Sequence, residues 1–369
     1  MRDHGAAFFA ASTAVDAALV CGALLLALRQ ARTGWRWVAA LGLVLVALAL
    51  KGVALVATGL DIPFGVMHVL WLDLIVVAPL AALLALRTWP SARPALRAAV
   101  VLALLLAPVG AYASLIEPDR LVTERARVPL ADDRTGRAPL KIAVIADLQF
   151  EQLGSHEREA IEHVLAERPD LILLAGDYHQ GSRLSFERQL PDVHRLLSKL
   201  HAPGGVFAVQ GDCESIGKAE EVFAGTGIRL LVDETARVRV RDRTVSIAGI
   251  ELRYWLPRAR AAMRRLEEAP GREDVRLLLS HRPDPVLRAA AHSRIDLFVA
   301  GHTHGGQLQL PFVGPLSTAT HVSRAVAAGG LHEVDGNRLY VSRGIGVERG
   351  QAPRLRLGAP PEVSILELR

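Results

Sequence analysis

The sequence predicts an α/β domain that follows an all-α membrane domain of four helices. Residues 1–117 consist largely of long apolar stretches, whereas short apolar runs that end in Asp or His recur between residues 118 and 369. A length of 369 residues also favours two structural units over one. We therefore predict a transmembrane domain over 1–117 and an α/β domain over 118–369.

Four apolar stretches near the N-terminus are each close to the roughly 20 residues that a membrane-spanning helix needs. They lie at about 8–28, 37–57, 63–86 and 98–116. A cleaved signal peptide would be a single short segment, so four stretches in series predict an integral membrane protein. The ionisable residues inside them are Asp16, Lys51, His68 and Asp73. The simplest interpretation is that Lys51 pairs with an aspartate to hold the bundle together, and a role in transport or sensing is the alternative.

The loops between these stretches predict the orientation in the membrane. The first loop contains Arg29, Arg32 and Arg36, the third contains Arg87, Arg93 and Arg97, and the second contains no Lys or Arg. Positively charged loops remain in the cytoplasm, so the first and third loops are predicted to be cytoplasmic. With four spans, both termini then lie outside. We expect residues 118–369 to face the periplasm or the exterior of a bacterial inner or cell membrane.

The charge and the cysteines exclude several classes of protein. The net charge is +5, and the arginines are scattered without a basic stripe interleaved with aromatic residues, so nucleic acid is not an expected partner. Cys21 and Cys213 are the two cysteines, and they lie far apart in the sequence. We therefore expect neither a disulfide framework nor a cysteine-based zinc site. The oligomeric state is left open.

Five short apolar runs after residue 139 are typical of buried strands, and each is followed by a candidate ligand. These residues are Asp147, Asp177, Asp212, His281 and His302, with His304 two positions further on. Amphipathic helices are predicted over 155–169, with Ser155 as the N-cap, and over 284–293, with Pro285 at the first position. Ligands bind at the carboxyl ends of strands in layered α/β sheets. Carboxylates and imidazoles gathered there suit divalent Mn, Fe or Zn.

The motifs at these strand ends resemble those of the calcineurin-like metallophosphoesterases, particularly the membrane-associated bacterial branch. The matching pieces are "ADLQ" (146–149), "GDY" (176–178), "GDCE" (211–214), "LSHRPD" (279–284) and "GHTHGGQ" (301–307). The resemblance covers about residues 118–369. It implies a four-layer α/β/β/α metallophosphoesterase sandwich with two metal ions at the strand ends.

The resemblance also implies roles for individual residues. Asp147 and His304 would hold the first metal, Asp177 would bridge both, and the second metal would be held by Asp212, His281 and His302. Gln149 is added as a weaker ligand, and the implied catalytic residues are Asp177, Asp212, Cys213 and His302. Two divalent ions would activate a hydroxide and clamp the phosphoryl oxygens. Mn²⁺ is the first expectation, with Fe, Zn or Mg as alternatives.

Three positions depart from the family pattern. Gln149 and Cys213 stand where the family usually has His, and Asp212 stands where it usually has Asn. An ordinary thiol, with a pKa of about 8.5, is a poor substitute for the histidine that binds phosphate and assists the leaving group. His179 is a candidate replacement for that histidine, and Cys213 as a nucleophile is a less favoured alternative. Glu214 is interpreted as an orienting acid, whereas a phosphate contact by Arg282 or Arg343 is left open.

The predicted function is that of a membrane-anchored, dinuclear-metal-dependent phosphoesterase that hydrolyses phosphodiester or pyrophosphate bonds. Its substrate would be a phosphorylated small molecule or a lipid-linked phosphate. The alternative is a catalytically weak metal- or phosphate-binding sensor or scaffold coupled to the membrane domain, which Gln149 and Cys213 favour. A transporter with a fused soluble domain is a third class.

Overall fold

The chain forms two compact units, which we describe separately. The computed structural model describes residues 4–28, 33–59, 67–69, 71, 73, 75, 79, 94–134, 136, 138–214, 216–271, 274–348 and 353–369. The first unit comprises Met1–Ile116 together with Glu348–Arg354, and the second comprises Glu117–Val347 and Leu355–Arg369.

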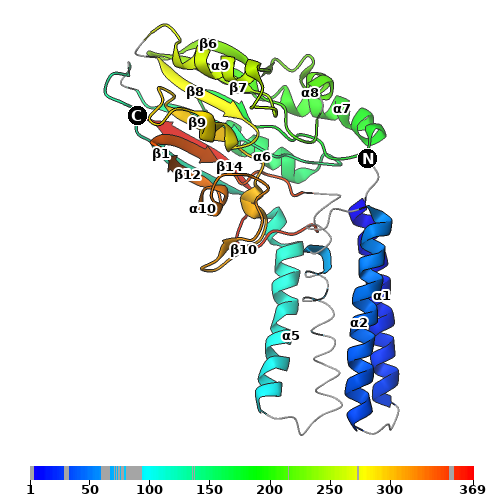
Figure 1. Ribbon diagram of the computed structural model, residues 1–369. Coiled ribbons are helices and arrows are strands. Elements are labelled where there is room, and N and C mark those ends of the chain that lie inside the picture. Colours follow the sequence, from blue (N-terminus) through cyan, green and yellow to red (C-terminus); the bar gives the residue numbers. More distant parts are fainter. Residues whose placement is uncertain are drawn as a thin grey trace. The chain divides into compact units, whose positions relative to one another are not determined.

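The described residues of the N-terminal part of the first unit, Met1–Ile116, are almost all helical (Figure 1). Helices α1 (His4–Leu28), α2 (Thr33–Thr58) and α5 (Pro94–Leu115) coincide with three of the predicted spans. Most of the predicted span at 63–86 lies outside the described residues. Among the described residues, one helical segment, Val101–Asp119, is long and apolar enough to cross a membrane. Ala10–Leu19 and Leu45–Thr58 are apolar but shorter, so the four-helix transmembrane domain stays a prediction.

Lys51 forms the ion pair that the sequence suggested. Its ammonium group lies 2.5 Å from Asp16 Oδ1 and also contacts Asp73 Oδ1, and Lys51 is only 4% exposed. Two carboxylates therefore surround one buried ammonium group, which compensates part of the cost of removing these charges from water. This arrangement agrees with the structural interpretation of Lys51.

The second unit contains two six-stranded sheets. Their arrangement brings together the ends of the strands that precede the candidate ligands. The first sheet has the order β1 (Val122–Val128), β14 (Glu362–Leu368), β2 (Leu140–Ile145), β3 (Leu171–Leu174), β4 (Val206–Ala208) and β5 (Arg229–Leu230). The second has the order β12 (Gly330–Val334), β13 (Asn337–Val341), β9 (Leu297–Ala300), β8 (Val275–Ser280), β7 (Arg243–Ile250) and β6 (Glu234–Val240). The strands β2, β3 and β4 are parallel, as are β13, β9, β8 and β7. All five predicted strands are present.

The alternation of side chains along the strands creates four layers. Ile142 and Val144 of β2 belong to a core cluster shared by both sheets, whereas Ala143 and Ile145 pack outward. Helices α6 (Ser155–Ala166), α7 (Arg183–Leu197) and α8 (Ile216–Phe223) cover that outer face. Helices α9 (Pro257–Glu267) and α10 (Arg324–Ala327) cover the outer face of the second sheet. The predicted α/β/β/α sandwich is therefore confirmed (Figure 1).

Two local predictions were wrong. The segment 284–293 forms only the short 3-10 turn η3 (Asp284–Arg288), and the backbone is extended at Ala289. The Asp284 carboxylate accepts hydrogen bonds from the Thr320 hydroxyl and the His321 backbone N–H, so it connects η3 to a distant loop. Ser155 is the first residue of α6, and Gly154 is its N-cap.

Candidate metal centre

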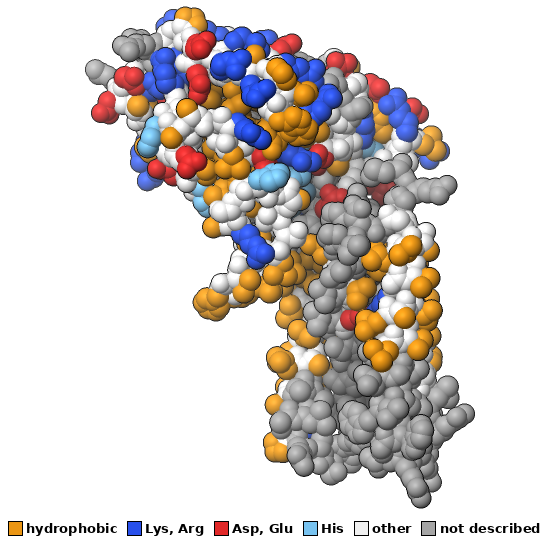
Figure 2. Space-filling model, in the orientation of Figure 1, with side chains coloured by type: hydrophobic (Ala, Val, Ile, Leu, Met, Phe, Trp, Pro, Cys, Tyr) orange, Lys and Arg blue, Asp and Glu red, His pale blue; other side chains and the backbone are white. Residues whose placement is uncertain are grey.

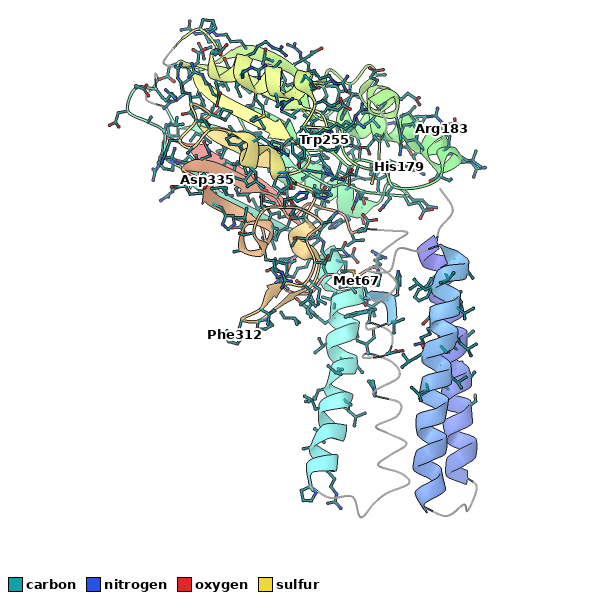
Figure 3. All side chains as sticks on the ribbon, in the orientation of Figure 1. Met67, His179, Arg183, Trp255, Phe312 and Asp335 are labelled. Carbon is teal, nitrogen blue, oxygen red and sulfur yellow. The ribbon has the colours of Figure 1, made fainter. Side chains whose placement is uncertain are left out.

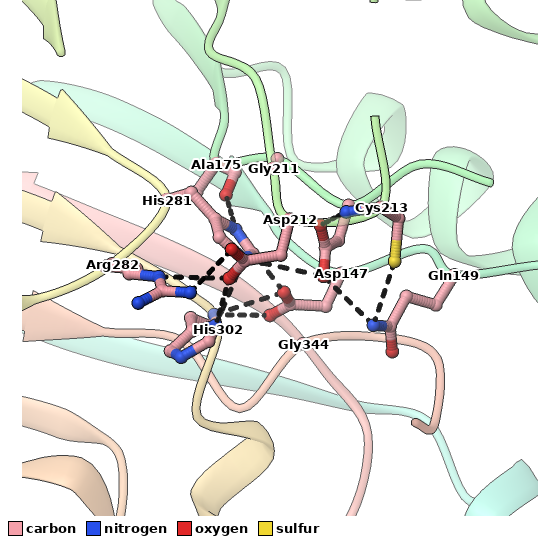
Figure 4. Close-up of polar contacts among 12 residues, drawn as sticks. Asp147, Gln149, Ala175, Gly211, Asp212, Cys213, His281, Arg282, His302 and Gly344 are labelled. Carbon is pink, nitrogen blue, oxygen red and sulfur yellow. Dashed lines mark hydrogen bonds and ion pairs between the residues drawn. The ribbon is translucent and has the colours of Figure 1, made fainter. Parts of the chain in front are cut away.

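The predicted ligands converge at the carboxyl ends of strands from both sheets (Figure 4). Asp147, Asp177 and Asp212 follow β2, β3 and β4, whereas His281 and His302 follow β8 and β9. Among the residues that the structure describes, two groups of side chains could each hold a cation, and they share His281. The first group consists of Asp147, Asp177 and His281. The second consists of Asp212, His281 and His302. Within each group the potential ligand atoms all lie within 4.8 Å of one another.

The backbone at the strand ends is strained. Asp147, Asp177, His302 and His304 all have positive φ angles, of 49°, 55°, 73° and 48°. Such conformations cost roughly 1–3 kcal/mol each for residues other than glycine, and they persist where the surrounding structure enforces them. A cluster of strained residues at one sheet edge therefore points to a functional site.

Glycines permit this close packing. A Cβ atom on Gly211 would lie 2.0 Å from the Asp177 backbone nitrogen, and one on Gly344 would lie 2.6 Å from the Asp147 Cβ. Both distances are below any real contact for a side chain, so larger residues would displace the two aspartates. The sequence signal for these glycines was present in "GDCE" and "SRGIG", but their role was visible only in three dimensions.

The second group of ligands directs three acceptor atoms at one point. The His281 Nδ1–H donates to Ala175 O at 2.8 Å, and the His302 Nε2–H donates to Ala319 O at 3.1 Å. With those protons fixed, His281 Nε2 and His302 Nδ1 both present lone pairs, and they lie 3.2 Å apart. The Asp212 Oδ2 atom lies 3.0 Å from His302 Nδ1. Only a proton or a cation can satisfy this arrangement, so these residues fit a metal ion.

Electrostatics lead to the same conclusion. Burial disfavours a charged His281, but the Asp177 and Asp147 charges and the hydrogen bond with Asp212 raise its pKa to about 10. Burial of the Asp147 carboxyl raises its pKa to about 7, and the nearby Asp177 charge adds to this shift. The Asp147 oxygens also accept the His302 backbone N–H at 3.0 and 3.1 Å. The site therefore concentrates negative charge, which a bound cation or a proton would compensate.

Two of the three unusual residues contact each other. The Gln149 amide nitrogen donates to Asp177 Oδ2 at 3.0 Å and to Cys213 Sγ at 3.6 Å. The Cys213 backbone N–H donates to Asp177 Oδ1 at 2.7 Å. Gln149 and Cys213 therefore both orient Asp177, the aspartate that is predicted to bridge the two metal ions. For Gln149 itself to ligate, its amide would have to turn so that the oxygen replaces the nitrogen.

The third unusual residue, Asp212, is paired with Arg282. The guanidinium group donates from Nε at 3.1 Å and from Nη2 at 2.6 Å to the two carboxylate oxygens (Figure 4). Although burial favours the neutral acid, contacts with the His281 and His302 rings and with the Arg282 guanidinium keep the pKa of Asp212 below its ordinary value. The extra carboxylate is thus compensated by Arg282, for which the sequence had left open a contact with phosphate. The signal was its position directly after His281.

His304 lies outside both groups of candidate ligands. It is buried, and its Nδ1 lies 3.2 Å from Nη2 of Arg356, which is itself completely buried. The Arg356 guanidinium also donates to the backbone oxygens of Arg343 and Gly346. Burial and the charge of Arg356 keep the pKa of His304 well below its ordinary value, so the ring is neutral, as a metal ligand must be. Its role as a ligand stays a prediction, as does that of Gln149.

Three other residues that the sequence analysis considered, His179, Glu214 and Arg343, make structural contacts. The His179 ring packs against Phe150 and Phe186, where burial lowers its pKa to about 4, and it belongs to neither ligand group. Glu214 accepts the backbone N–H groups of Tyr178, His179 and Gly211, as an orienting acid would. Arg343 forms ion pairs with Glu124 and Glu362.

Comparison with known proteins identifies the class to which this site belongs. Residues 140–306 match the family model described as calcineurin-like phosphoesterase. The chain is 31% identical over 255 residues to the phosphodiesterase YaeI of Escherichia coli (strain K12), which covers 66% of this chain and 88% of that protein. It is 27% identical over 266 residues to the uncharacterized metallophosphoesterase YkuE of Bacillus subtilis (strain 168), covering 70% of this chain and 89% of that protein.

The chain therefore belongs to the calcineurin-like metallophosphoesterase family. It is a metal-dependent hydrolase of phosphoric esters, and the two groups of candidate ligands lie within the segment that matches the family model.

Proposed function

We propose that the chain is a membrane-anchored phosphoesterase that cleaves phosphodiester or pyrophosphate bonds, including those of lipid-linked substrates, with two divalent ions. The observation that supports this most directly is the convergence of His281 Nε2, His302 Nδ1 and Asp212 Oδ2 on one point. Asp177, Asp147 and His281 supply the donors for the neighbouring position. When bound, two divalent ions would provide Lewis acidity and a nucleophile at neutral pH.

The chain's own residues suggest which bonds are favoured. Arg282 places a guanidinium group at the partly exposed side of the site, where an anionic substrate would arrive, and its side chain is 34% exposed. The family histidine that assists the leaving group is replaced by Cys213, and His179 packs away among aromatic rings. A weakly basic leaving oxygen needs no proton, whereas an alkoxide does. We therefore propose that anhydrides and activated diesters are preferred over alkyl monoesters.

Turnover of bis-p-nitrophenyl phosphate by the full-length chain with Mn²⁺ tests the proposed activity. We expect metal-dependent release of p-nitrophenol, faster than the release of phosphate from a simple alkyl monoester. Pyrophosphate diesters should also be hydrolysed. An absence of turnover for all three classes in metal-loaded protein would favour the sensor or scaffold instead.

The proposed attachment to a membrane rests on the apolar segment Val101–Asp119 and on the arginine-containing loops of the sequence. We expect alkaline phosphatase fused after Arg369 to be active in a bacterial host, because this enzyme works only outside the cytoplasm. A green fluorescent protein fusion at the same position should stay dark. The reverse pattern, with a fluorescent and phosphatase-negative fusion, would place the phosphoesterase domain in the cytoplasm.

A further inference from the structure

A short hairpin beside the metal centre exposes apolar side chains to solvent. Strands β10 (Gln309–Leu310) and β11 (Gly314–Pro315) pair antiparallel, and we call residues 309–316 the apolar hairpin. Leu310, Phe312, Val313 and Leu316 are exposed, and Phe312 is fully exposed at the tip (Figure 3). Figure 2 shows the hydrophobic side chains gathered on this projection. Exposed apolar clusters commonly mark surfaces that contact a membrane or another protein.

The tip is held in its exposed position. Phe312 has a φ angle of +66°, which is unfavourable for a bulky residue, and the Val313 N–H closes the turn on Leu310 O at 3.2 Å. The Gln309 side chain anchors the base by donating to Gly305 O and Ala328 O, at 2.9 and 2.8 Å. The projection is therefore built into the fold, and strain at the tip is tolerated to present the phenyl ring.

The hairpin is also continuous with the metal centre. Its chain begins three residues after the GHTHGG segment, and a Cβ on Gly306 would lie 2.5 Å from Pro315 Cβ. Just beyond the hairpin, Ala319 O accepts the hydrogen bond that orients His302. A partner surface that binds the hairpin tip would therefore lie close to the loop that carries His302 and His304.

The chemistry of the tip favours lipid as the partner. Residues 308–320 contain no charged side chain. Four apolar side chains at a turn are also far fewer than the roughly 20–30 residues that each partner contributes to a stable protein interface.

The second unit also starts at Glu117, inside the apolar segment Val101–Asp119, and the Glu117 carboxylate accepts the Ala359 N–H at 3.0 Å. With this helix in a bilayer, almost no linker would separate the domain from the lipid surface.

We propose that the apolar hairpin inserts its tip into a lipid bilayer and so presents the metal centre to phosphates at the level of the headgroups. This inference rests on the proposed function and names its substrate class as phosphoesters embedded in lipid. Apolar side chains at an interface enter the boundary between the headgroups and the acyl chains, so the protein surface beside them lies at the level of the headgroup phosphates.

Photo-crosslinking of the full-length chain tests the insertion without relying on activity. Benzoylphenylalanine replaces Phe312 in one variant and Leu184 in a control, because Leu184 is also an exposed apolar residue but lies in α7. In phosphatidylcholine liposomes we expect lipid adducts at position 312 and none at position 184. Adducts at 312 with a second copy or another protein, or no lipid adduct, would overturn the proposal.

Hydrolysis tests the consequence for substrates. A long-chain alkyl p-nitrophenyl phosphate embedded in the liposomes is compared with soluble bis-p-nitrophenyl phosphate. For the Phe312→Ser/Val313→Ser variant we expect the ratio of embedded to soluble turnover to fall about tenfold, and for Leu184→Ser we expect no change. An unchanged ratio in the hairpin variant would also overturn the proposal. A lack of soluble turnover in the wild type would instead refute the proposed function, and the lipid adducts would remain interpretable.

Discussion

Replacing His302 with alanine should lower kcat for bis-p-nitrophenyl phosphate by roughly a thousandfold. The substitution removes one of the three acceptor atoms that converge on the second candidate position. A catalytic metal ion supplies several kcal/mol of stabilisation to the transition state, and about 1.4 kcal/mol corresponds to a factor of ten. Asp177→Ala should have an effect at least as large, because Asp177 also anchors Gln149 and Cys213. The measurement combines steady-state kinetics with bound metal per chain by mass spectrometry.

The control is His201→Ala, because His201 is exposed and its ring contacts the nearby Lys199 carbonyl. That variant should keep both its activity and its metal content. Full activity with normal metal content in either His302→Ala or Asp177→Ala would refute the two-metal account. Thermal unfolding of each variant separates a lost ligand from a lost fold.

The Arg282→Met substitution should raise KM for an anionic diester and lower kcat/KM by about 10–100-fold. It removes the guanidinium that donates two hydrogen bonds to the Asp212 carboxylate, and the uncompensated charge would repel the substrate. Hydrogen bonds to charged groups contribute about 1.5–3 kcal/mol, which corresponds to this range. Arg282→Lys should lie between the two, because an ammonium group cannot donate the same bidentate pair.

A double-mutant cycle with Asp212→Asn shows whether the pair acts as a unit. In the Asp212→Asn background no carboxylate remains to be neutralised, so Arg282→Met should cost at least threefold less than in the wild type. Arg183→Met serves as the matched control, because Arg183 forms exposed ion pairs with Glu187 and Glu221. Such surface pairs contribute about 0–1 kcal/mol, so activity should stay within a few-fold. Independent effects of Arg282 and Asp212 would show that their pairing has no role in catalysis.

The candidate ligands could be predicted because they depend on local sequence. A buried strand is recognisable from its apolar run, and the residue that follows it must lie at the sheet edge. Asp147, Asp177, Asp212, His281 and His302 therefore come together in the structure as the sequence indicated. The packing of two sheets followed from the family resemblance, and the alternating burial of residues such as Ile142 and Ala143 shows its physical basis.

Contacts between distant segments could not be predicted in this way. A phosphate contact by Arg282 was left open from the sequence, but its pairing with Asp212, 70 residues away, was visible only in the structure. Arg356 reaches His304 from the C-terminal segment, which carries no metal-ligand pattern. The predicted helix at 284–293 failed for a similar reason, since the Asp284 side chain bonds to Thr320 and His321 in a later loop. Local propensity contains no information about these partners.

The most direct test of the account is a metal titration of the full-length protein. Chelator-treated protein is titrated with Mn²⁺ while bound metal and the hydrolysis of bis-p-nitrophenyl phosphate are followed together. The account predicts no turnover without metal, binding of two equivalents per chain, and activity that rises fully only as the second equivalent binds. Saturation at one equivalent, or undiminished hydrolysis by metal-free protein, would contradict it.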